Sequence, residues 1–287
     1  MLRADEVHLD LPEFRLLREL FNETCGLAFG ADSRPLLERR LRERVNALGL
    51  SSFGEYHQFL RFHERGRAEL EEAIDLVTVN ETYFFREAYQ LRAYRLEILP
   101  MLAASEGRIS VWSAGCSTGE EVYTIAITTR ESGLYTEPTA LRVFGSDISR
   151  RCVAAARRGV YGPASFRATS VEMKKRYFVE RNDGASVAEE LRGNCNFGHL
   201  NLLDATRALV VGRVDVIFCR NVLIYFDDAS RRRVIDMFYD RLLPGGFLLL
   251  GHSESLLNVS TAFELVHLRD DLVYRKPRSQ SRFDFNP

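Results

Sequence analysis

A glycine turn between a short apolar run and a helical pattern constrains the fold more than any other stretch of this chain. The run 109–112 leads into the turn SAGCSTG at 113–119. The pattern behind it has inward residues at i, i+3, i+4 and i+7, namely Val122, Ile125, Ala126 and Thr129. A strand, a glycine turn and a helix in this order direct free backbone N–H groups towards a nucleotide-like ligand. Two glycines separated by three residues are not the dinucleotide fingerprint, so the turn alone also fits an ordinary connection.

Beyond residue 109, short apolar runs alternate with helical patterns. Strands are expected at 109–113, 141–146, 214–219 and 247–251, and helices at about 120–131, 149–157 and 228–242. Such alternation predicts a parallel sheet with right-handed crossovers and helices on both faces. Pro244-Gly245-Gly246 predicts a turn before the fourth strand, and the runs 263–267 and 272–274 predict an antiparallel pair at the sheet edge. The expected fold is therefore a Rossmann-like α/β sheet.

Residues 1–75 show no strand pattern and predict an all-helical N-terminal domain. Ser33 is the expected N-cap of its second helix, with Pro35 in the first turn. Five arginines stand against two glutamates within eleven residues of that helix: Arg34, Arg39, Arg40, Arg42 and Arg44. They form either a solvated outer face or a basic surface for an acidic partner.

A second domain is expected over 76–287, with its first residues forming a linker that also makes one wall of a pocket. Weak strand runs around the Asn182–Gly184 turn predict a small β insertion at about 176–198. Residues 276–287 are expected to be a loose polar tail.

Composition narrows the classes of function. The formal net charge is −1, which gives the whole molecule no case for binding nucleic acid or a membrane. The five cysteines are scattered and lack the spacing of a zinc site, so no metal is expected and reduced thiols predict a cytoplasmic location. No apolar run approaches the ~20 residues of a membrane-spanning helix, and the charged start predicts no signal peptide.

Polar residues follow the predicted strands at their carboxyl ends, where open α/β sheets bind ligands. Asp147 is placed either to accept hydrogen bonds from a ribose or to cap the next helix. Arg220, Asn221 and Tyr225 lie just beyond the strand 214–219. His252 ends the last strand on this edge; it is either catalytic or, the favoured reading, structural.

Arg86 follows the three adjacent aromatic residues Tyr83–Phe85. In such an apolar neighbourhood a guanidinium needs a carboxylate or phosphate partner. That partner is either a ligand or a protein carboxylate such as Glu87, and the residues alone leave both readings open.

Six segments, in this order and spacing, closely resemble the chemotaxis receptor methyltransferases, the CheR family. They are TVNETYFFRE (78–87), VWSAGCSTGEE (111–121), GSDIS (145–149), NLL (201–203), FCRNVLIYFD (218–227) and GHSES (251–255). The resemblance covers roughly residues 10–275. The glycine turn also resembles motif I of S-adenosylmethionine-dependent methyltransferases, although Ser117 replaces its middle glycine and Ser113 stands where many carry an acid.

This resemblance implies a set of cofactor-binding residues: Asn80, Thr82, Arg86, Gly115, Glu120, Glu121, Asp147, Asn201, Leu202, Arg220 and Asn221. Arg86 is implied to bind the cofactor carboxylate, Asp147 the ribose, and Asn201 with Leu202 the adenine. Of the two glutamates, Glu121 is the favoured one. Arg86 and Tyr225 are the catalytic candidates, orienting the cofactor and the acceptor.

The implied reaction moves a methyl group from S-adenosylmethionine to the γ-carboxylate of a receptor glutamate and leaves S-adenosylhomocysteine. Because a glutamate with a pKa of ~4.3 is ionised at neutral pH, no general base is required. Alternatives are a methyltransferase of small molecules and a non-catalytic S-adenosylmethionine-binding module. A nicotinamide-dependent oxidoreductase is disfavoured, since it needs the missing glycine.

The implied partners are the cytoplasmic helices of methyl-accepting chemotaxis receptors, which carry many glutamates, and the basic helix Arg34–Arg44 is the expected docking surface. The stretch 181–196 is short and lacks a Gly-Arg-Gly-like turn, so binding of a receptor's C-terminal pentapeptide is not expected. A monomer is expected.

Overall fold

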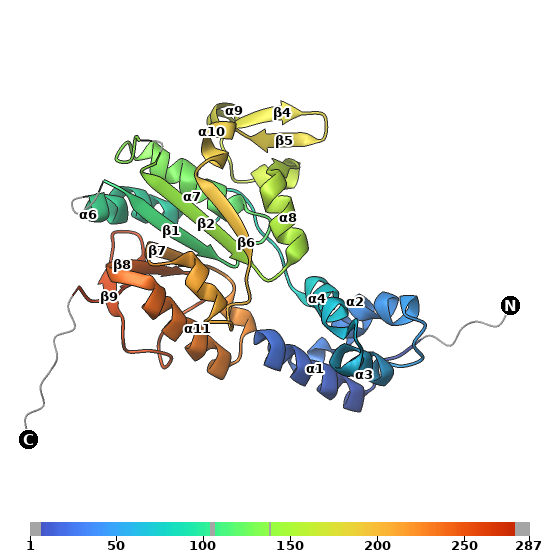
Figure 1. Ribbon diagram of the computed structural model, residues 1–287. Helices are drawn as coiled ribbons and strands as arrows, with labels where there is room; N and C mark the ends of the chain where they lie inside the picture. Colours follow the sequence, from blue (N-terminus) through green and yellow to red (C-terminus); the bar gives the residue numbers. More distant parts are fainter. Residues whose placement is uncertain (1–6, 104–106, 138, 279–287) are drawn as a thin grey trace, which may run out of the picture.

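The computed structural model describes residues 7–103, 107–137 and 139–278 of the 287-residue chain. Figure 1 shows N-terminal helices lying beside a part built on a central sheet. Several contacts join these parts, at two separate places. Asn22 donates to the Asp227 carboxylate at 2.9 Å, and Arg150 pairs with Glu71 at 2.7 Å. The helical part therefore packs against the sheet part at two separate places.

The N-terminal part contains the helices α1 (Leu11–Cys25), α2 (Arg34–Ala47), α3 (Phe53–Phe62) and α4 (Gly66–Val77), with a short 3-10 turn η1 (Ala31–Ser33). The helical prediction for this region is confirmed. Asp10 and Glu13 form a capping box at the start of α1, and Gly26 ends that helix with φ 77°. Ser33 precedes α2 as expected, but its side chain accepts no capping hydrogen bond because η1 runs directly into the helix.

A seven-stranded sheet forms the second part, in the order β6-β2-β1-β7-β8-β10-β9. Its strands are β1 (Ile109–Ala114), β2 (Leu141–Asp147), β6 (Cys195–His199), β7 (Val214–Cys219), β8 (Leu242–Leu250), β9 (Glu264–His267) and β10 (Leu272–Arg275). The strands from β6 to β8 pair in parallel, whereas β10 is antiparallel to both neighbours. The expected mostly parallel sheet with an antiparallel edge is confirmed.

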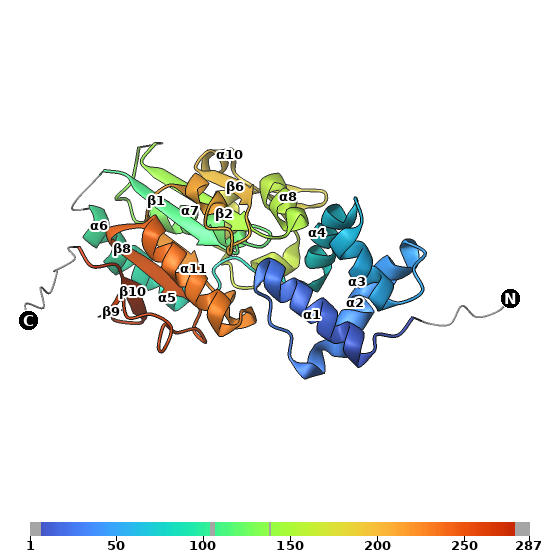
Figure 2. The same ribbon diagram turned by 60° about the horizontal axis from the view of Figure 1, so that its bottom comes forward.

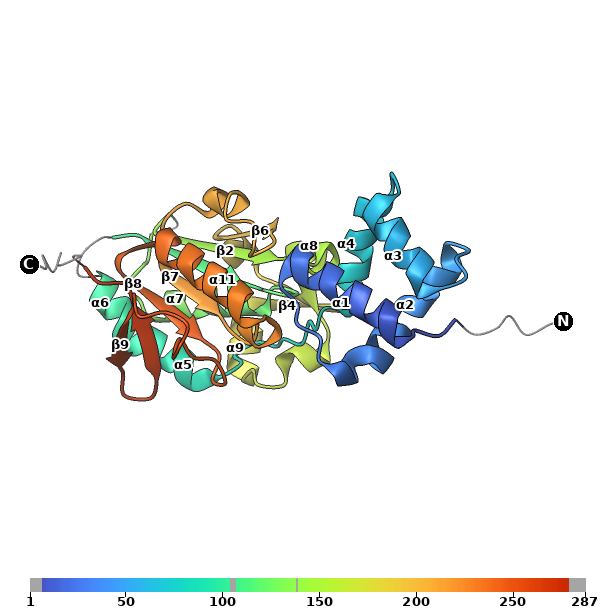
Figure 3. The same ribbon diagram turned by 90° about the horizontal axis from the view of Figure 1, so that it is seen from below.

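Helices cover both faces of this sheet, because the central strands carry apolar residues at successive positions, which point to opposite sides. Val111 and Val216 pack in one core with α7 (Glu120–Glu131). Apolar residues of α8 (Arg150–Arg158) pack in the same core. Trp112 and Ile217 pack in the other core with α11 (Asp228–Arg241). Figure 2 shows α11 lying along the sheet strands. Figure 3 shows the end of α1 near the start of α11.

Shorter elements complete the chain. They are α5 (Ala88–Ala93), the π-helix η2 (Tyr94–Ile98), α6 (Leu99–Ala103), η3 (Pro163–Phe166), α9 (Val171–Tyr177), α10 (Glu189–Arg192), η4 (Arg207–Val211) and η5 (Leu223–Tyr225). No helix within the described ranges has the length and apolar character to cross a membrane.

The predicted turn at 244–246 is wrong, because β8 runs unbroken from Leu242 through these residues. The glycines serve close packing instead. A Cβ on Gly246 would lie 2.7 Å from the Asp215 carbonyl oxygen, and Gly245 has φ 83°. The pairing of β7 with β8 changes register here, between Val214 and Val216.

The β insertion differs from its predicted range of 176–198. A separate three-stranded sheet has the order β3-β5-β4, from β3 (Val160–Tyr161), β5 (Gly184–Val187) and β4 (Phe178–Arg181). It therefore begins near residue 160, whereas β6, within the predicted range, belongs to the main sheet through the pairing of Val143 with Cys195. Pairing over such sequence distances leaves no local signal in the chain.

The predicted loose tail starts too early. Lys276 is buried, and its Nζ donates to the carbonyl oxygens of Tyr239 at 2.7 Å and Leu242 at 3.0 Å. Its backbone also pairs with Gly245 and Gly246. Residues 279–287 lie outside the described ranges.

Candidate active site

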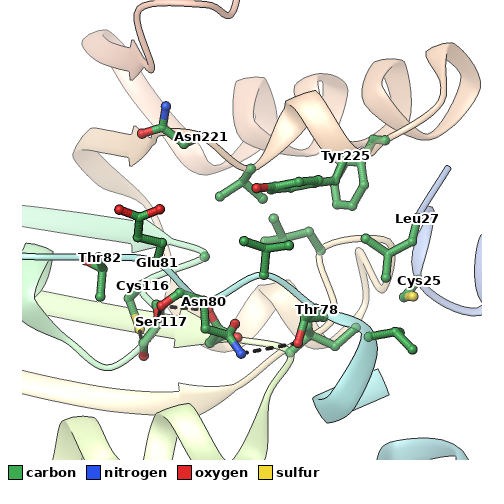
Figure 4. A pocket seen from close by; sticks show the side chains of 18 of the residues that line it. Cys25, Leu27, Thr78, Asn80, Glu81, Thr82, Cys116, Ser117, Asn221 and Tyr225 are labelled. Carbon is green, nitrogen blue, oxygen red and sulfur yellow. Dashed lines mark hydrogen bonds between the residues drawn. The ribbon is translucent and has the colours of Figure 1, made fainter. Parts of the chain in front are cut away.

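A cavity of about 260 Å³ lies at the carboxyl ends of β1, β2 and β7 and is called the central cavity below. Figure 4 shows side chains from both parts of the molecule surrounding it, with Tyr225 facing Asn80 and Thr78 across the space. All the predicted catalytic and cofactor-binding residues except Glu120 line it: Asn80, Thr82, Arg86, Gly115, Glu121, Asp147, Asn201, Leu202, Arg220, Asn221 and Tyr225. Sequence segments far apart in the chain therefore meet here.

The glycine turn that follows β1 is tied to the end of β2. Gly115 has φ 80°, and a Cβ there would lie 2.4 Å from Cγ2 of Val222, so no other residue fits. The backbone N–H groups of Gly115 and Cys116 donate to the Ser146 carbonyl oxygen at 2.8 and 2.9 Å. Ser117 completes the turn by donating its own N–H to Asp147 at 2.7 Å. The turn thus shapes one wall of the central cavity.

Asp147 is a buried carboxylate at the end of β2. Its Oδ2 accepts from Ser117 N, and its Oδ1 accepts from Ser149 N at 2.8 Å. Burial raises the pKa of Asp147, and these hydrogen bonds oppose the rise. The helix-cap reading is wrong, since Ser149 caps α8 by accepting from Cys152 N. Each carboxylate oxygen keeps a second acceptor site, which suits a ribose diol.

The two glutamates at the start of α7 have different environments. Glu120 points away from the central cavity and accepts hydrogen bonds from Thr118 Oγ1 at 2.6 Å and Ser165 Oγ at 2.9 Å. Burial raises its pKa. Its inclusion among the cofactor residues is therefore wrong, because its carboxylate is used to hold the 163–166 turn. Glu121 faces the central cavity and accepts from Ser113 Oγ at 2.7 Å.

Arg220 is almost fully enclosed, with only 2% of its side chain exposed. Its Nε donates to Glu121 Oε2 at 2.7 Å, and its Nη1 donates to the Arg86 carbonyl oxygen at 2.8 Å. Glu87 lies 3.6 Å from the same Nη1. Two carboxylates already neutralise the charge of Arg220. Its side chain therefore connects residues 86–87 to Glu121 within the cavity wall.

Arg86 has the opposite character. Its guanidinium donates to the Glu81 carbonyl oxygen at 2.9 Å and lies 5.8 Å from the centre of the Tyr83 ring. Among the described residues, no carboxylate lies within ion-pair distance of it, and Glu87 faces Arg220 instead. The reading in which Glu87 pairs with Arg86 is therefore wrong. Arg86 brings a positive charge to the central cavity without a protein counter-charge.

The Arg220–Tyr225 segment forms the cavity wall beyond β7. Asn221 adopts a left-handed conformation with φ 60°. Its Oδ1 is buried and has no hydrogen-bond partner among the described residues. Tyr225 lines the same wall, and its carbonyl oxygen accepts from Ala28 N at 2.8 Å. A buried acceptor without a partner is a position where a ligand donor belongs.

The N-terminal part supplies a wall that the sequence reasoning missed. The residues are Cys25, Leu27, Ala28, Phe29, Ser33 and Leu36. Leu27 bridges to Phe226, and Asn201 reaches across to donate to the Thr24 carbonyl oxygen at 2.6 Å. The apolar run 27–29 between two glycines was the available signal, but it reads equally well as an ordinary loop.

The predicted basic surface on α2 is mostly used inside the molecule. Arg44 pairs with the buried Glu69, Arg42 pairs with Glu38, and Arg40 donates to the Val77 carbonyl oxygen at 2.8 Å. Arg34 donates to the Leu9 carbonyl oxygen at 3.3 Å. Arg39 alone of the five is exposed. Arg34, Arg40 and Arg44 therefore link α2 to neighbouring segments, whereas Arg42 pairs with Glu38 of the same helix. Receptor docking by this helix stays a prediction.

His252 is exposed and lies next to Ser253 Oγ at 2.9 Å. It does not line the central cavity. The structural reading favoured from the sequence fits this position better than a catalytic role.

The chemistry of the central cavity fits S-adenosylmethionine. Asp147 offers acceptors for a diol, Arg86 a free cation for a carboxylate, and Asn221 an unpartnered acceptor. Leu27, Leu202 and other apolar side chains cover the remaining wall and suit an adenine ring. A pyrophosphate would need several backbone N–H groups at the glycine turn, yet those of Gly115, Cys116 and Ser117 are already bonded to β2.

Comparison with known proteins supports the same conclusion. Residues 80–272 match the CheR methyltransferase, SAM binding domain, and residues 12–78 match the CheR methyltransferase, all-alpha domain. Chemotaxis protein methyltransferase 2 of Vibrio cholerae is 35% identical over 95% of this chain and 96% of its own length. The chemotaxis protein methyltransferase of Escherichia coli is 35% identical over 94% of this chain and 93% of its own.

Among solved structures, the N-methyltransferase NodS from Bradyrhizobium japonicum in complex with S-adenosyl-L-homocysteine is similar, with a TM-score of 0.40 and 17% identity. It covers 78% of this chain and 97% of its own. The two domain matches together span almost the whole described chain, and they carry the assignment. The chain belongs to the CheR family of S-adenosylmethionine-dependent methyltransferases.

Proposed function

We propose that this enzyme transfers the methyl group of S-adenosylmethionine to the γ-carboxylates of glutamates on chemotaxis receptors and forms methyl esters. The relatives are named chemotaxis protein methyltransferases and align with this chain along nearly their full length. The observation that carries the proposal is the central cavity itself. It gathers an unpaired cation, a buried carboxylate and a tyrosine from three separate segments at Arg86, Asp147 and Tyr225.

In this proposal different wall residues bind different parts of the cofactor. Asp147 accepts from the ribose hydroxyls, and Arg86 binds the carboxylate of the methionine part. Asn201 and Leu202 bracket the adenine, while Asn80 and Thr82 line the methionine end. Asn80 is held there because its carbonyl oxygen accepts from Ser117 Oγ at 3.0 Å. When bound, the cofactor supplies an electrophilic methyl group on a positively charged sulfur.

The protein's own contribution to the reaction is alignment and exclusion of water. A glutamate side chain is ionised at neutral pH, so no residue has to remove a proton from it. Tyr225 is proposed to orient the acceptor carboxylate, since it lines the cavity wall opposite Asn80 and Thr78 (Figure 4). A carboxylate freed of water in line with the methyl group is a stronger nucleophile, and alignment lowers the entropic part of the barrier.

For receptor docking, Arg39 is the α2 arginine that we retain. It is exposed, and the described residues offer it no hydrogen bond or ion pair. A single exposed cation suits attraction to glutamate-rich helices but not a tight ion-paired contact. We also keep as proposals the division of the chain near residue 75, a cytoplasmic location, a monomeric state and the absence of pentapeptide binding.

The test uses S-adenosylmethionine carrying a labelled methyl group and purified cytoplasmic fragments of candidate receptors. The proposal predicts label on the fragment that alkali releases, as expected of a methyl ester. A matched fragment with its acceptor glutamates changed to alanine should take up no label. If the enzyme binds S-adenosylhomocysteine but labels no receptor fragment, it is a binding module or acts on a small molecule.

A further inference from the structure

The carboxylate of Glu254 collects backbone N–H groups from the cavity wall although it lies outside the central cavity. Its Oε2 accepts from Asn221 N at 2.8 Å, and its Oε1 accepts from Val222 N at 2.9 Å and from Ile224 N at 3.3 Å. Gly251 N donates to the same Oε2 at 2.7 Å. One side chain therefore takes four backbone hydrogen bonds, three of them from the segment that carries Tyr225.

The backbone of this segment has the shape of an anion-binding nest. Asn221 is left-handed with φ 60°, and Val222 follows with φ −118° and ψ −48°. Successive residues of opposite hand point their N–H groups into one concavity, which favours negative charge. A left-handed asparagine is also strained and persists only where its surroundings hold it. Glu254 supplies the negative charge, and its hydrogen bonds fix the backbone of this segment.

Gly251 is part of the same arrangement. A Cβ at this position would lie 2.7 Å from Glu254 Oε2 and 2.8 Å from Asn221 N. The backbone that follows β8 can therefore approach the nest only because residue 251 has no side chain. The segment GHSES at 251–255 thus receives a physical role that does not involve His252.

The clamped segment contacts the other wall of the central cavity. The side chain of Val222 fills the space next to Gly115, where a Cβ would lie 2.4 Å away. Asn221, Val222 and Tyr225 all line the cavity, whereas Glu254 does not. A shift of the segment would move the unpartnered Asn221 Oδ1 and the Tyr225 ring together.

We propose that Glu254 is a positioning residue for methyl transfer, which fixes Asn221 and Tyr225 by filling the backbone nest at 221–224. The inference rests on the proposed function, because its effect on rate is seen only with an acceptor. Glu254 takes no part in the chemistry and touches neither cofactor nor acceptor. An amide in its place keeps the size but turns one acceptor oxygen into a donor that faces N–H groups.

The test compares Glu254→Gln with Glu264→Gln, the same change at an exposed carboxylate of β9 that pairs with Arg275. Glu254→Gln is expected to lower kcat for receptor methylation by ~10- to 100-fold, because a misplacement of about 1 Å has an effect of this size. KM for the receptor should stay within about 2-fold, because the proposed docking residue Arg39 lies on α2 and not near Glu254. Hydrogen exchange of the peptide 219–226 should become faster, while exchange in α2 and β1 stays unchanged. Glu264→Gln should alter none of these quantities.

A third variant, Glu254→Asp, keeps the charge and should recover part of the lost rate. Unchanged kcat in a folded Glu254→Gln variant would overturn the proposal, and so would faster exchange across the whole chain, which indicates a general stability role. If the wild-type enzyme methylates no receptor fragment, the proposed function fails instead. In that case exchange of 219–226 in the Glu254→Gln variant still decides whether Glu254 holds the nest.

Discussion

Arginines at two places in this molecule differ in whether the protein supplies them with partners, although the sequence shows no partner for either group. On α2, Arg40 and Arg44 turn inward and are satisfied by the Val77 carbonyl oxygen and by Glu69. In the central cavity, Arg86 makes no ion pair with any described residue and donates to a backbone carbonyl oxygen, although Arg220 nearby is neutralised by carboxylates. The density of charge in a sequence therefore does not reveal a binding surface. What reveals it is a charge whose surroundings leave it unpaired beside a cavity.

The two regions should respond differently to mutation. Changes in the central cavity should alter binding and rate while the fold survives. Changes on α2 should mainly alter stability, except at Arg39.

Replacing Asp147 by alanine should weaken binding of S-adenosylhomocysteine by about 100-fold or more, since two charged hydrogen bonds to a ribose contribute roughly 3 kcal/mol. Calorimetric titration measures this effect. The matched control is Ser149→Ala, which removes the neighbouring helix cap and should leave the affinity within a few-fold. Equal affinities for wild type and Asp147→Ala would place the ribose elsewhere.

Arg86→Met should weaken S-adenosylhomocysteine by about 10- to 100-fold, because a charge-assisted contact to the ligand carboxylate is lost. 5′-Methylthioadenosine lacks that carboxylate, so its affinity should be the same for both proteins. A parallel loss for both ligands would show that Arg86 supports the cavity wall and does not bind the carboxylate.

Arg44→Met should lower the free energy of unfolding by about 2 kcal/mol, because it leaves the buried Glu69 without its cation. The thermal unfolding temperature should fall by several degrees. The double variant Arg44→Met/Glu69→Gln should regain much of this loss. At a temperature where the variant is folded, its KM for the receptor should match that of the wild type. A large rise in KM would show that Arg44 takes part in receptor docking.

Arg39→Glu should raise KM for the receptor several-fold and leave both the unfolding temperature and the affinity for S-adenosylhomocysteine unchanged. The effect should shrink as salt is added, because exposed charges are screened. Measured KM at low and high ionic strength tests this. If KM does not change at low salt, the docking surface lies away from α2.

Glu120→Gln has the smallest expected effect, and it depends on pH. Burial raises the pKa of Glu120 above that of an unfolded glutamate, so the folded chain binds this proton more tightly. Stability is therefore lost as the pH rises from the unfolded pKa through the folded one. The amide cannot ionise, so the variant should gain stability relative to wild type at about pH 8 compared with about pH 5. Thermal scans at both values measure it; a relative loss at high pH would contradict this sign.

The sequence predicted the sheet well where local patterns are strong. Helix α7 has the expected bounds, and β7 has the expected residues, because both combine continuous periodicity with clear flanking signals. The turn predicted at 244–246 was wrong because a glycine pair usually indicates a turn. Here Gly246 instead allows close packing against Asp215 of the neighbouring strand. The pairing of β3 with β5 could not be predicted from the sequence, because a strand of two residues is too short to show an alternating pattern.

The candidate site was predictable where a motif couples a residue to its role. Asp147 and Asn221 were found because polar residues at the carboxyl ends of strands meet at one edge. Glu120 was assigned wrongly since adjacent residues at a helix start point in different directions, and only the partner Ser165 decides between them. The wall formed by Leu27 and Ala28 depends on how two parts of the chain pack, which no local pattern encodes.

A crystal structure of the enzyme with S-adenosylhomocysteine tests most directly the claim that the central cavity is the cofactor site. We predict that the ligand ribose lies on Asp147, the ligand carboxylate on Arg86, and the sulfur beside Tyr225. Density for the ligand in another place, or a bound ligand whose carboxylate does not contact Arg86, would contradict the account.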